Sequence, residues 1–208
     1  MRSGRELSRL LDDTAGVPAR LQDYRSARAA GWVAIVLIAV AAALEVARPN
    51  LVLVVGAEVV AAVAFLAWVR GAYANLRSLG AQVLRDTPAS AVFWFVVPVF
   101  GWVMPYLVMR DLWKLSDSSD PHGLQEAGSK LVLVWWLLWV GPGLAILAVV
   151  FVRPTFEIGS AGLAILINML ISVRLVAAVL AAAVVLNITA RQEASHRVLL
   201  AQVEDGGL

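Results

Sequence analysis

Residues 93–113 read FWFVVPVFGWVMPYLVMRDLW, an apolar stretch long enough to cross a bilayer that also holds three helix-breaking residues. Pro98 and Pro105 lack a backbone N–H, and Gly101 between them permits a tight reversal. Charged residues follow from Arg110 onward. The segment therefore either crosses the membrane as a proline-kinked helix or dips in and returns on the same side. This choice decides the topology of the whole chain.

The composition of the 208-residue chain is that of a membrane protein. Hydrophobic residues make up 61% and charged residues 15%, whereas soluble domains carry roughly 45–50% and about 25%. The mean hydropathy is +0.80. The chain has no cysteine, which excludes disulfides, thiol catalysis and thiolate metal sites. The net charge is only +2, and the arginines flank apolar runs instead of forming a basic patch, so nucleic acid is not an expected partner.

Four apolar runs are predicted to be transmembrane helices, because each approaches the ~20 residues that a helix needs to cross a bilayer. They cover about residues 31–49, 51–72, 131–152 and 165–190, and the first two are joined by a Pro-Asn turn. The second is expected to project beyond the membrane and to end near Gly80.

Three polar segments complete the predicted organisation. They are a cytoplasmic N-terminal segment (1–30), with a surface helix or a frayed tail at 4–15, a cytoplasmic connector (114–130), and a cytoplasmic tail (193–208) that is helical and then frayed. The N-terminal segment is too polar and acidic for a cleaved signal peptide, so the first apolar run is predicted to be a permanent anchor.

The distribution of lysine and arginine favours a dip over a crossing. If residues 89–112 form a re-entrant hairpin, fourteen basic side chains lie on the side of the two termini and two on the other; if they cross, the split is ten against six. Cytoplasmic loops carry the excess of basic residues. We therefore predict an all-α integral membrane protein with four transmembrane helices plus a broken re-entrant hairpin, and five spans as the alternative. Irregular backbone at membrane depth needs protein or water around it, so the spans are expected to enclose the turn.

Three stretches resemble a family of bacterial membrane proteins described as domain of unknown function 4328. They are WVRGAYANLRSLGA (68–81), TPASAVFWFVVPVFGWVMPYLVMRDLW (87–113) and NITARQ (187–192). The most specific residues are Asn75, Leu76, Arg77, Trp94, Pro98, Pro105, Arg110, Leu112 and Trp113. The resemblance covers roughly residues 30–195 and implies a multi-pass protein of a bacterial inner membrane. It implies no activity.

Sequence motifs for catalysis or for cofactor binding are absent. No nucleophile elbow, metalloprotease, P-loop or dinucleotide pattern occurs. His122 and His196 lie outside the predicted spans, so an intramembrane haem or zinc site is not available, and a solvated side chain is expected for each. We therefore expect no cofactor and no metal.

A few polar residues interrupt the apolar runs, namely Glu45, Glu58, Asn168, Arg174 and Asn187. Ionisable groups inside a bilayer usually face the protein interior with a partner. Glu58 lies ~11 Å below the outer end of its helix, and an outer boundary near residue 170 brings Arg174 within its reach. We predict an ion pair between them; the alternative is that Arg174 extends unpaired to the outer headgroups. Glu45, near its helix end, is interpreted as an interfacial carboxylate.

Two functions are compatible with these features. The first is a non-enzymatic structural or accessory subunit in the bilayer, with a homo-oligomer or a protein on its cytoplasmic face as partner. The second is a small transporter or channel component that uses the broken segment and the intramembrane Glu and Arg residues. An enzyme acting on lipids lacks a nucleophile and a base. The candidate structural or functional residues are Glu58, Arg174, Asn75, Arg77, Pro98, Gly101, Pro105 and Arg110.

Overall fold

The computed structural model describes residues 21, 23–81, 84–97, 100–117, 129–152 and 159–204, and every regular element within these ranges is helical. The elements are α2 (Arg28–Ala47), α3 (Leu51–Ser78), α4 (Pro88–Phe93), the 3₁₀ helix η1 (Phe100–Trp102), α5 (Met104–Leu115), α6 (Lys130–Val152) and α7 (Ser160–Glu204). Within the described ranges four helices, α2, α3, α6 and α7, are long and apolar enough to cross a membrane. The predicted all-helical protein with four such helices is confirmed. The expected helix at 4–15 lies outside the described residues.

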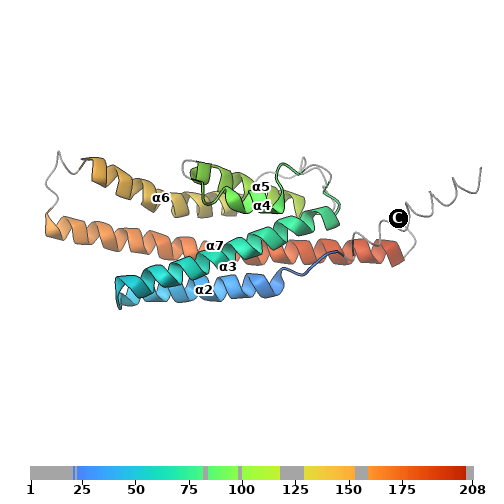
Figure 1. The fold of residues 1–208 in the computed structure, drawn as a ribbon, viewed down its shortest axis with the longest axis horizontal. Coiled ribbons are helices and arrows are strands. Elements are labelled where there is room, and N and C mark those ends of the chain that lie inside the picture. Colours follow the sequence, from blue (N-terminus) through green and yellow to red (C-terminus); the bar gives the residue numbers. More distant parts are fainter. Residues whose placement is uncertain are drawn as a thin grey trace, which may run out of the picture.

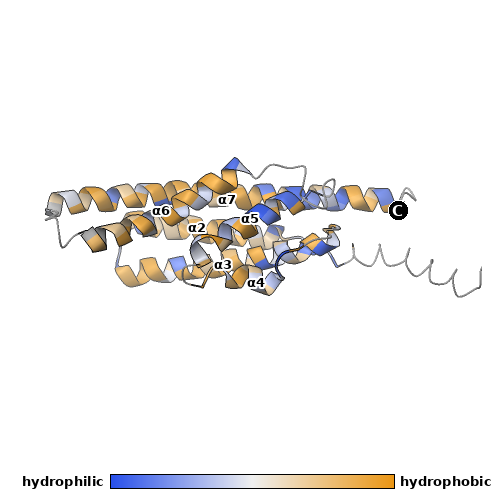
Figure 2. Cartoon of the chain, turned by 90° about the horizontal axis from the view of Figure 1, so that it is seen from above, coloured by the Kyte–Doolittle hydropathy of each residue, from blue (hydrophilic) through white to orange (hydrophobic). Residues whose placement is uncertain are grey.

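The four long helices form two antiparallel hairpins, α2–α3 and α6–α7, which meet where α2 packs on α7 (Figure 1). The first and last parts of the described chain lie on one side, because the ring of Tyr24 stacks on that of His196 with centroids 4.1 Å apart. We call this side the terminal end, and the opposite side, with the α2–α3 turn at residues 48–50, the turn end. The long helices are apolar over most of their length, and polar residues gather toward the terminal end (Figure 2).

Local chemistry explains where the first hairpin turns. Arg48 adopts a left-handed conformation with φ 50° and donates its N–H to the carbonyl of Leu44, which caps α2. Asn50 then caps α3, because its side chain accepts the N–H of Leu53 at 2.9 Å. The far end of α3 closes at Ser78, with Gly80 at φ 92°. The Pro-Asn turn and the stop near Gly80 are thereby confirmed.

The last helix continues well past the predicted span. α7 is one helix of 45 residues that runs to Glu204, so the described part of the tail is helical, as predicted for its first part. At about 1.5 Å per residue the helix is roughly 68 Å long, more than twice a bilayer's ~30 Å hydrocarbon core. Its terminal part therefore projects beyond the apolar region, where it packs against the start of the described chain.

The core lies in the half of the bundle nearer the terminal end. Its fully buried side chains include Trp68, Tyr73, Leu76, Met109, Leu112, Val184 and Ile188. The small residue Gly31 lets α2 approach closely, because a Cβ there would lie 3.1 Å from Val185 Cγ1 and 3.4 Å from the ring of Trp68. Small residues at helix contacts are how membrane helices gain van der Waals packing without a strong hydrophobic drive.

The segment that opened the sequence analysis is not one continuous helix. α4 has 6 residues and α5 has 12, and 12 residues rise only ~18 Å, short of a bilayer core. Thr87 caps α4 by accepting the Ser90 N–H at 3.1 Å, and Pro88 follows at the first helical position. Pro98 lies outside the described residues.

Both ends of this broken segment lie at the same level of α3. Before α4, the Asp86 N–H donates to the Tyr73 hydroxyl at 3.2 Å. After α5, the Gln192 amide donates both to Ser116 Oγ at 3.2 Å and to the Ala72 carbonyl at 2.9 Å. Between them, Phe95 reaches Phe65, with ring centroids 6.0 Å apart. The segment thus runs ~12 Å along α3, from the level of residue 73 to that of residue 65, and returns.

The neighbouring helices do not enclose the bend, and this expectation was wrong. Gly101 and Pro105 are buried, but the apolar side chains around them point away from the bundle. Those of Phe93, Phe100 and Val103 are more than half exposed within the chain. The bend therefore packs on the outside of α3, with an apolar surface that suits lipid or another apolar partner.

Candidate functional site

The predicted ion pair between Glu58 and Arg174 is present and joins α3 to α7. The same guanidinium also reaches α2, because Arg174 Nε lies 3.1 Å from Glu45 Oε1. Our interpretation of Glu45 as an interfacial carboxylate was therefore wrong, and its side chain is only 15% exposed. Three helices thus contribute one arginine and two carboxylates to a single cluster, which we call the charge cluster (Glu45, Glu58 and Arg174).

The depth of the charge cluster follows from the turn end. There Arg48 donates to Asn168 Oδ1 at 2.6 Å, which brings residue 168 of α7 level with the α2–α3 turn. Arg174 is six residues further along, ~9 Å deeper. This register brings Arg174 to the level of Glu58, as the predicted ion pair required. The guanidinium of Arg174 pairs with two carboxylates, so Arg174 does not extend unpaired to the headgroups in this structure.

The charge cluster lines one part of a cleft of ≈ 630 Å³ between the long helices. Alanines from three helices form much of the wall, namely Ala41 and Ala42 of α2, Ala61 and Ala62 of α3, and Ala177, Ala178 and Ala181 of α7. Short side chains leave the space open. The opposite wall comes from α6, with Trp135, Trp139, Pro142, Gly143 and Ile146. Pro142, which lies inside α6, thus faces the cleft together with Gly143.

Three aromatic rings form the wall of the cleft nearest the terminal end. Phe65 of α3 lies 6.0 Å from Phe95 of the broken segment and 5.9 Å from Trp135 of α6, measured between ring centroids. Phe95 and Val96 both line the cleft. The bend between α4 and η1 thus supplies the side chains that separate the cleft from the packed core. We call Phe65, Phe95 and Trp135 the aromatic wall.

A buried polar network holds the terminal end together. Gln192, which is fully buried, donates to the Ala72 carbonyl and to Ser116 Oγ and accepts from Asn75 Nδ2 at 3.3 Å. Asn75 also accepts the Arg25 N–H at 3.2 Å and donates to the Arg25 carbonyl at 2.8 Å. Asn75 therefore ties the chain before α2 to α3 and α7, which is a structural role.

The sequence analysis missed the α7 members of this network. Thr189, Gln192 and Ser195 lie three residues apart on one helix face and are all buried. Thr189 accepts the Trp68 indole N–H at 3.1 Å, and Ser195 donates to the Ser116 carbonyl at 2.8 Å. The regular spacing in the helical tail was the available signal.

His196 is also not solvated as predicted. It stacks on Tyr24, and its Nε2 lies 3.3 Å from the Leu21 carbonyl. Burial, and secondarily the charge of Glu193, raises the pKa of Tyr24 to about 12. The phenol is therefore neutral at physiological pH. Because the pKa of Tyr24 is 10 in the unfolded chain and about 12 in the folded one, the stability of the fold decreases as the pH rises from 10 to 12.

Ion pairs join the two ends of the broken segment. Arg85 Nη2 lies 3.3 Å from Asp111 Oδ2, and Asp86 Oδ1 accepts the Trp94 indole N–H at 2.8 Å. Arg110, one of the candidate residues, lies 3.7 Å from Asp111. Burial raises the pKa of Asp111, and the neighbouring Arg85 and Arg110 oppose that rise. Arg77 lies exposed on α3 and does not belong to this group.

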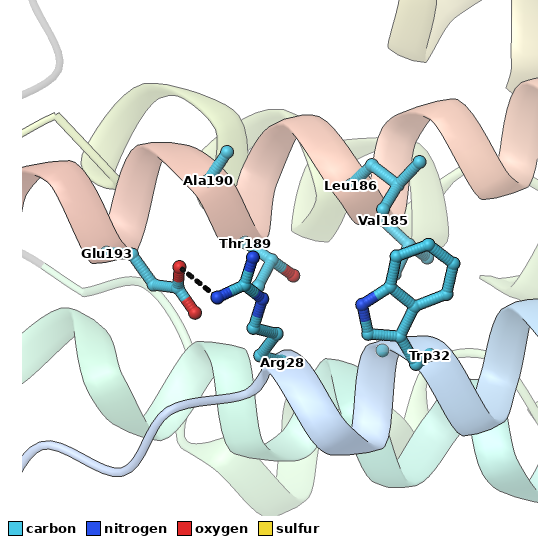
Figure 3. A pocket seen from close by; sticks show the side chains of 8 residues that line it. Arg28, Trp32, Val185, Leu186, Thr189, Ala190 and Glu193 are labelled. Carbon is cyan, nitrogen blue, oxygen red and sulfur yellow. Dashed lines mark ion pairs between the residues drawn. The ribbon is translucent and has the colours of Figure 1, made fainter.

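A second, smaller recess of ≈ 100 Å³ lies between α2 and α7 near the terminal end (Figure 3). Its charged members already face each other, with Arg28 Nη1 3.9 Å from Glu193 Oε2. Ser26 also donates to Glu193 at 3.1 Å. Among the described residues, no three histidine, aspartate or glutamate side chains come close enough to hold a metal ion. The cleft with the charge cluster is therefore the better candidate for a functional site.

Gly101 packs against the backbone of the bend without an unusual conformation, since Gly80 is the glycine with positive φ in the described residues. A Cβ on Gly101 would lie 3.4 Å from the Phe95 carbonyl oxygen and 3.5 Å from that of Trp94. We expect Gly101→Ala to fold normally and Gly101→Leu to lower the yield and the melting temperature in detergent. Gly71→Leu is the control, because nothing lies within 4 Å of its Cβ position. Equal behaviour of the two leucine variants would contradict the packed bend.

Comparison with known proteins identifies the family and not the activity. Neither the curated proteins nor the solved structures contain a match to this chain. A family model matches residues 19–191, which include all four long helices up to Arg191 of α7, the broken segment and the charge cluster. The chain belongs to the family described as domain of unknown function (DUF4328).

Proposed function

We propose that this chain is a non-enzymatic protein of a bacterial inner membrane that works as a small transporter or channel component. The observation that carries the proposal is the cleft of ≈ 630 Å³ with the charge cluster on its wall and the broken segment at its terminal end. Ligand sites in proteins are commonly of this size, mostly apolar and supplied with a few convergent polar groups.

A purely structural subunit has no need of this arrangement. Each charge in the apolar zone costs about 2.5–3.5 kcal/mol on insertion scales, and the alanine-rich faces would stabilise the bundle better if they closed the cleft. Broken helices beside intramembrane charges are recurrent at the substrate sites of transporters. Charges retained beside an open space therefore favour a ligand or ion over a role in packing alone.

The proposed topology has four spans, a re-entrant hairpin at 89–112 and both termini in the cytoplasm. Two observations support it. The broken segment begins and ends beside Ala72 and Tyr73 of α3, and this end of the bundle has the larger share of the basic residues. The apolar side chains exposed at the bend are suited to the inner leaflet.

The accessory role is the second candidate, and the exposed bend favours it. Phe93, Phe100 and Trp102 present apolar surface beside the terminal end, where another copy or a membrane protein of the same cell can pack. In that case the broken segment is a docking element and not part of a route through the protein.

A flux assay separates the two candidates. Purified protein is placed in liposomes loaded with the pH dye pyranine, and a potassium diffusion potential drives protons across. We expect flux above that of protein-free liposomes, a return to the protein-free rate in Glu58→Gln, and unchanged flux in Glu193→Gln, which alters a carboxylate outside the cleft. A wild-type chain without flux, together with a partner recovered by crosslinking in the membrane, would favour the accessory role.

Single cysteines test the topology, since the chain has no cysteine of its own. Ala89, exposed at the start of α4, and Ser118, just after the described end of α5, are each replaced by cysteine. Both should react with an impermeant maleimide from the cytoplasmic side, and Leu51→Cys at the turn end should react from the opposite side. Labelling of position 118 from the same side as position 51 would mean that residues 89–112 cross the membrane.

A further inference from the structure

We propose that the cleft binds a lipophilic monocation, a molecule with one positive centre (a phosphonium, a quaternary ammonium or a protonated amine) on an apolar body of about 10 Å. This inference rests on the proposed function and names its ligand class. It follows from the charges that line the cleft, from their distance to the aromatic wall, and from the chemistry of the surfaces between them.

The charges of the cleft do not balance. Two carboxylates, Glu45 and Glu58, share the guanidinium of Arg174, so the charge cluster carries one negative charge in excess when both are ionised. Arg48 keeps its positive charge, because its partner Asn168 is neutral, but it lies exposed at the turn end and does not line the cleft. A cation in the cleft would restore neutrality, whereas an anion would face an excess of carboxylate in a low-dielectric setting.

The remaining surface of the cleft suits an apolar and aromatic body. From Glu58 to Phe65 there are seven residues of one helix, a rise of ~10 Å. A cation beside Glu58 would therefore place an apolar body of that length against the aromatic wall. Trp135 and Trp139 stack with ring centroids 6.3 Å apart, and both line the cleft. Indole faces attract cations and pack well on apolar groups.

The walls supply few hydrogen-bond donors or acceptors for a polar body. Apart from the charge cluster, the lining side chains are alanines, other aliphatic residues, aromatic residues, a proline and a glycine. A sugar, a peptide or a hydrated inorganic ion would lose hydrogen bonds to water on binding and regain few. This argument restricts the ligand to a molecule whose only strongly polar feature is its positive charge.

Binding of two ions of matched size and opposite charge tests the proposal. Tetraphenylphosphonium and tetraphenylborate have the same shape, and equilibrium dialysis against purified protein in detergent measures the affinity for each. We expect saturable binding of the phosphonium, tighter than that of the borate by about tenfold or more. Equal affinity for the two ions would overturn the proposal.

Three variants locate the site. Glu45→Gln neutralises the cluster but keeps the Glu58–Arg174 pair, so the chain should fold and lose most of its preference for the cation. Glu193→Gln removes the same charge outside the cleft and should keep the preference. Ala62→Leu narrows the cleft at an exposed wall position without a change of charge, and it should weaken binding of the phosphonium.

The variants also separate the ligand from the proposed function. A Glu45→Gln variant that melts like the wild type and keeps its preference would overturn the proposed ligand class, whatever the flux assay gives. Binding with the expected preference in a protein that shows no proton flux would leave the ligand class intact and refute the proton movement expected from the proposed function. Binding is measured at equilibrium in detergent, so it does not depend on movement across a membrane.

Discussion

Replacing Arg174 by glutamine should destabilise the bundle more than any other single substitution in the cleft. Arg174 is the cation that two carboxylates share, with Glu45 at 3.1 Å and Glu58 as the second partner. Its removal leaves like charges facing each other in an apolar zone. Removing one member of a buried ion pair typically costs about 3–5 kcal/mol. The side chains of Arg174 and Glu58 are 43% and 34% exposed within the chain, so we expect Arg174→Gln to fall near the lower end of that range.

The carboxylate variants should behave differently because the cluster has three members. Glu45→Gln or Glu58→Gln each leave Arg174 with one partner, so each should cost less than Arg174→Gln. Once Arg174 is gone, removing Glu58 as well should restore stability, so the double variant should cost clearly less than the sum of the single ones, with a coupling of about 0.5–3 kcal/mol. Reversible unfolding in mixed micelles, followed by circular dichroism, measures these differences.

Arg77→Gln provides the control for the loss of one arginine charge, because Arg77 is exposed on α3. It should leave the unfolding free energy within about 0.5 kcal/mol of the wild type. Additive costs for Glu58→Gln and Arg174→Gln would contradict a working ion pair. The charge cluster would then be a geometric contact that contributes little to stability.

The ion pair could be predicted because a charged side chain within an apolar run has few ways to be stabilised other than a charged partner. Glu58 and Arg174 fall in the interior of apolar runs, where an ionisable side chain is expected to have a partner. Glu45 was misjudged because its position near the end of α2 offers the interface as a second solution. In the structure Arg174 pairs with both carboxylates, because its Nε faces Glu45 of α2 and its Nη2 faces Glu58 of α3. Such sharing depends on the packing angle of three helices, which no local pattern encodes.

The sequence predicted that the helix is interrupted in the broken segment, but it did not predict how that segment packs on the bundle. Prolines and the early return of charged residues at Arg110 exclude a regular helix. Which face of the bend would be buried was not predictable, because almost all of its residues are apolar and carry no periodic contrast. The cleft was invisible for the same reason. Its alanines are equally typical of close contacts between helices, and the cleft between them becomes visible only when the helices are assembled.

The terminal end illustrates the opposite case, in which polar residues carried an unused signal. The last part of α7 is polar in sequence and looks solvated, yet Gln192 and Ser195 are buried beside Ser116. These side chains make hydrogen bonds to backbone carbonyls of elements far away in the sequence. Their three-residue spacing predicts one polar helix face, but it does not identify the partner that covers that face.

Trp68→Ala should have an effect as large as that of Arg174→Gln, through loss of packing instead of charge. The Trp68 side chain is fully buried. It lies under Gly31 of α2 and donates its indole N–H to Thr189 of α7 at 3.1 Å, so one ring joins three helices. Truncation of a buried tryptophan typically costs about 3–5 kcal/mol, because the cavity collapses only in part. The surroundings here are helix backbones that cannot easily move inward.

Two matched variants separate the sources of that loss. Trp68→Phe keeps an aromatic ring but leaves the buried Thr189 hydroxyl without the indole donor, at a cost of about 1–3 kcal/mol. Trp102→Ala removes the same type of side chain from the exposed bend, where it is 44% exposed, and should change the unfolding free energy by about 0.5 kcal/mol or less. The same unfolding experiment in mixed micelles measures all three variants. If Trp68→Ala proved as mild as Trp102→Ala, α2, α3 and α7 would not be held together at this ring, and the core of the bundle would have to lie elsewhere.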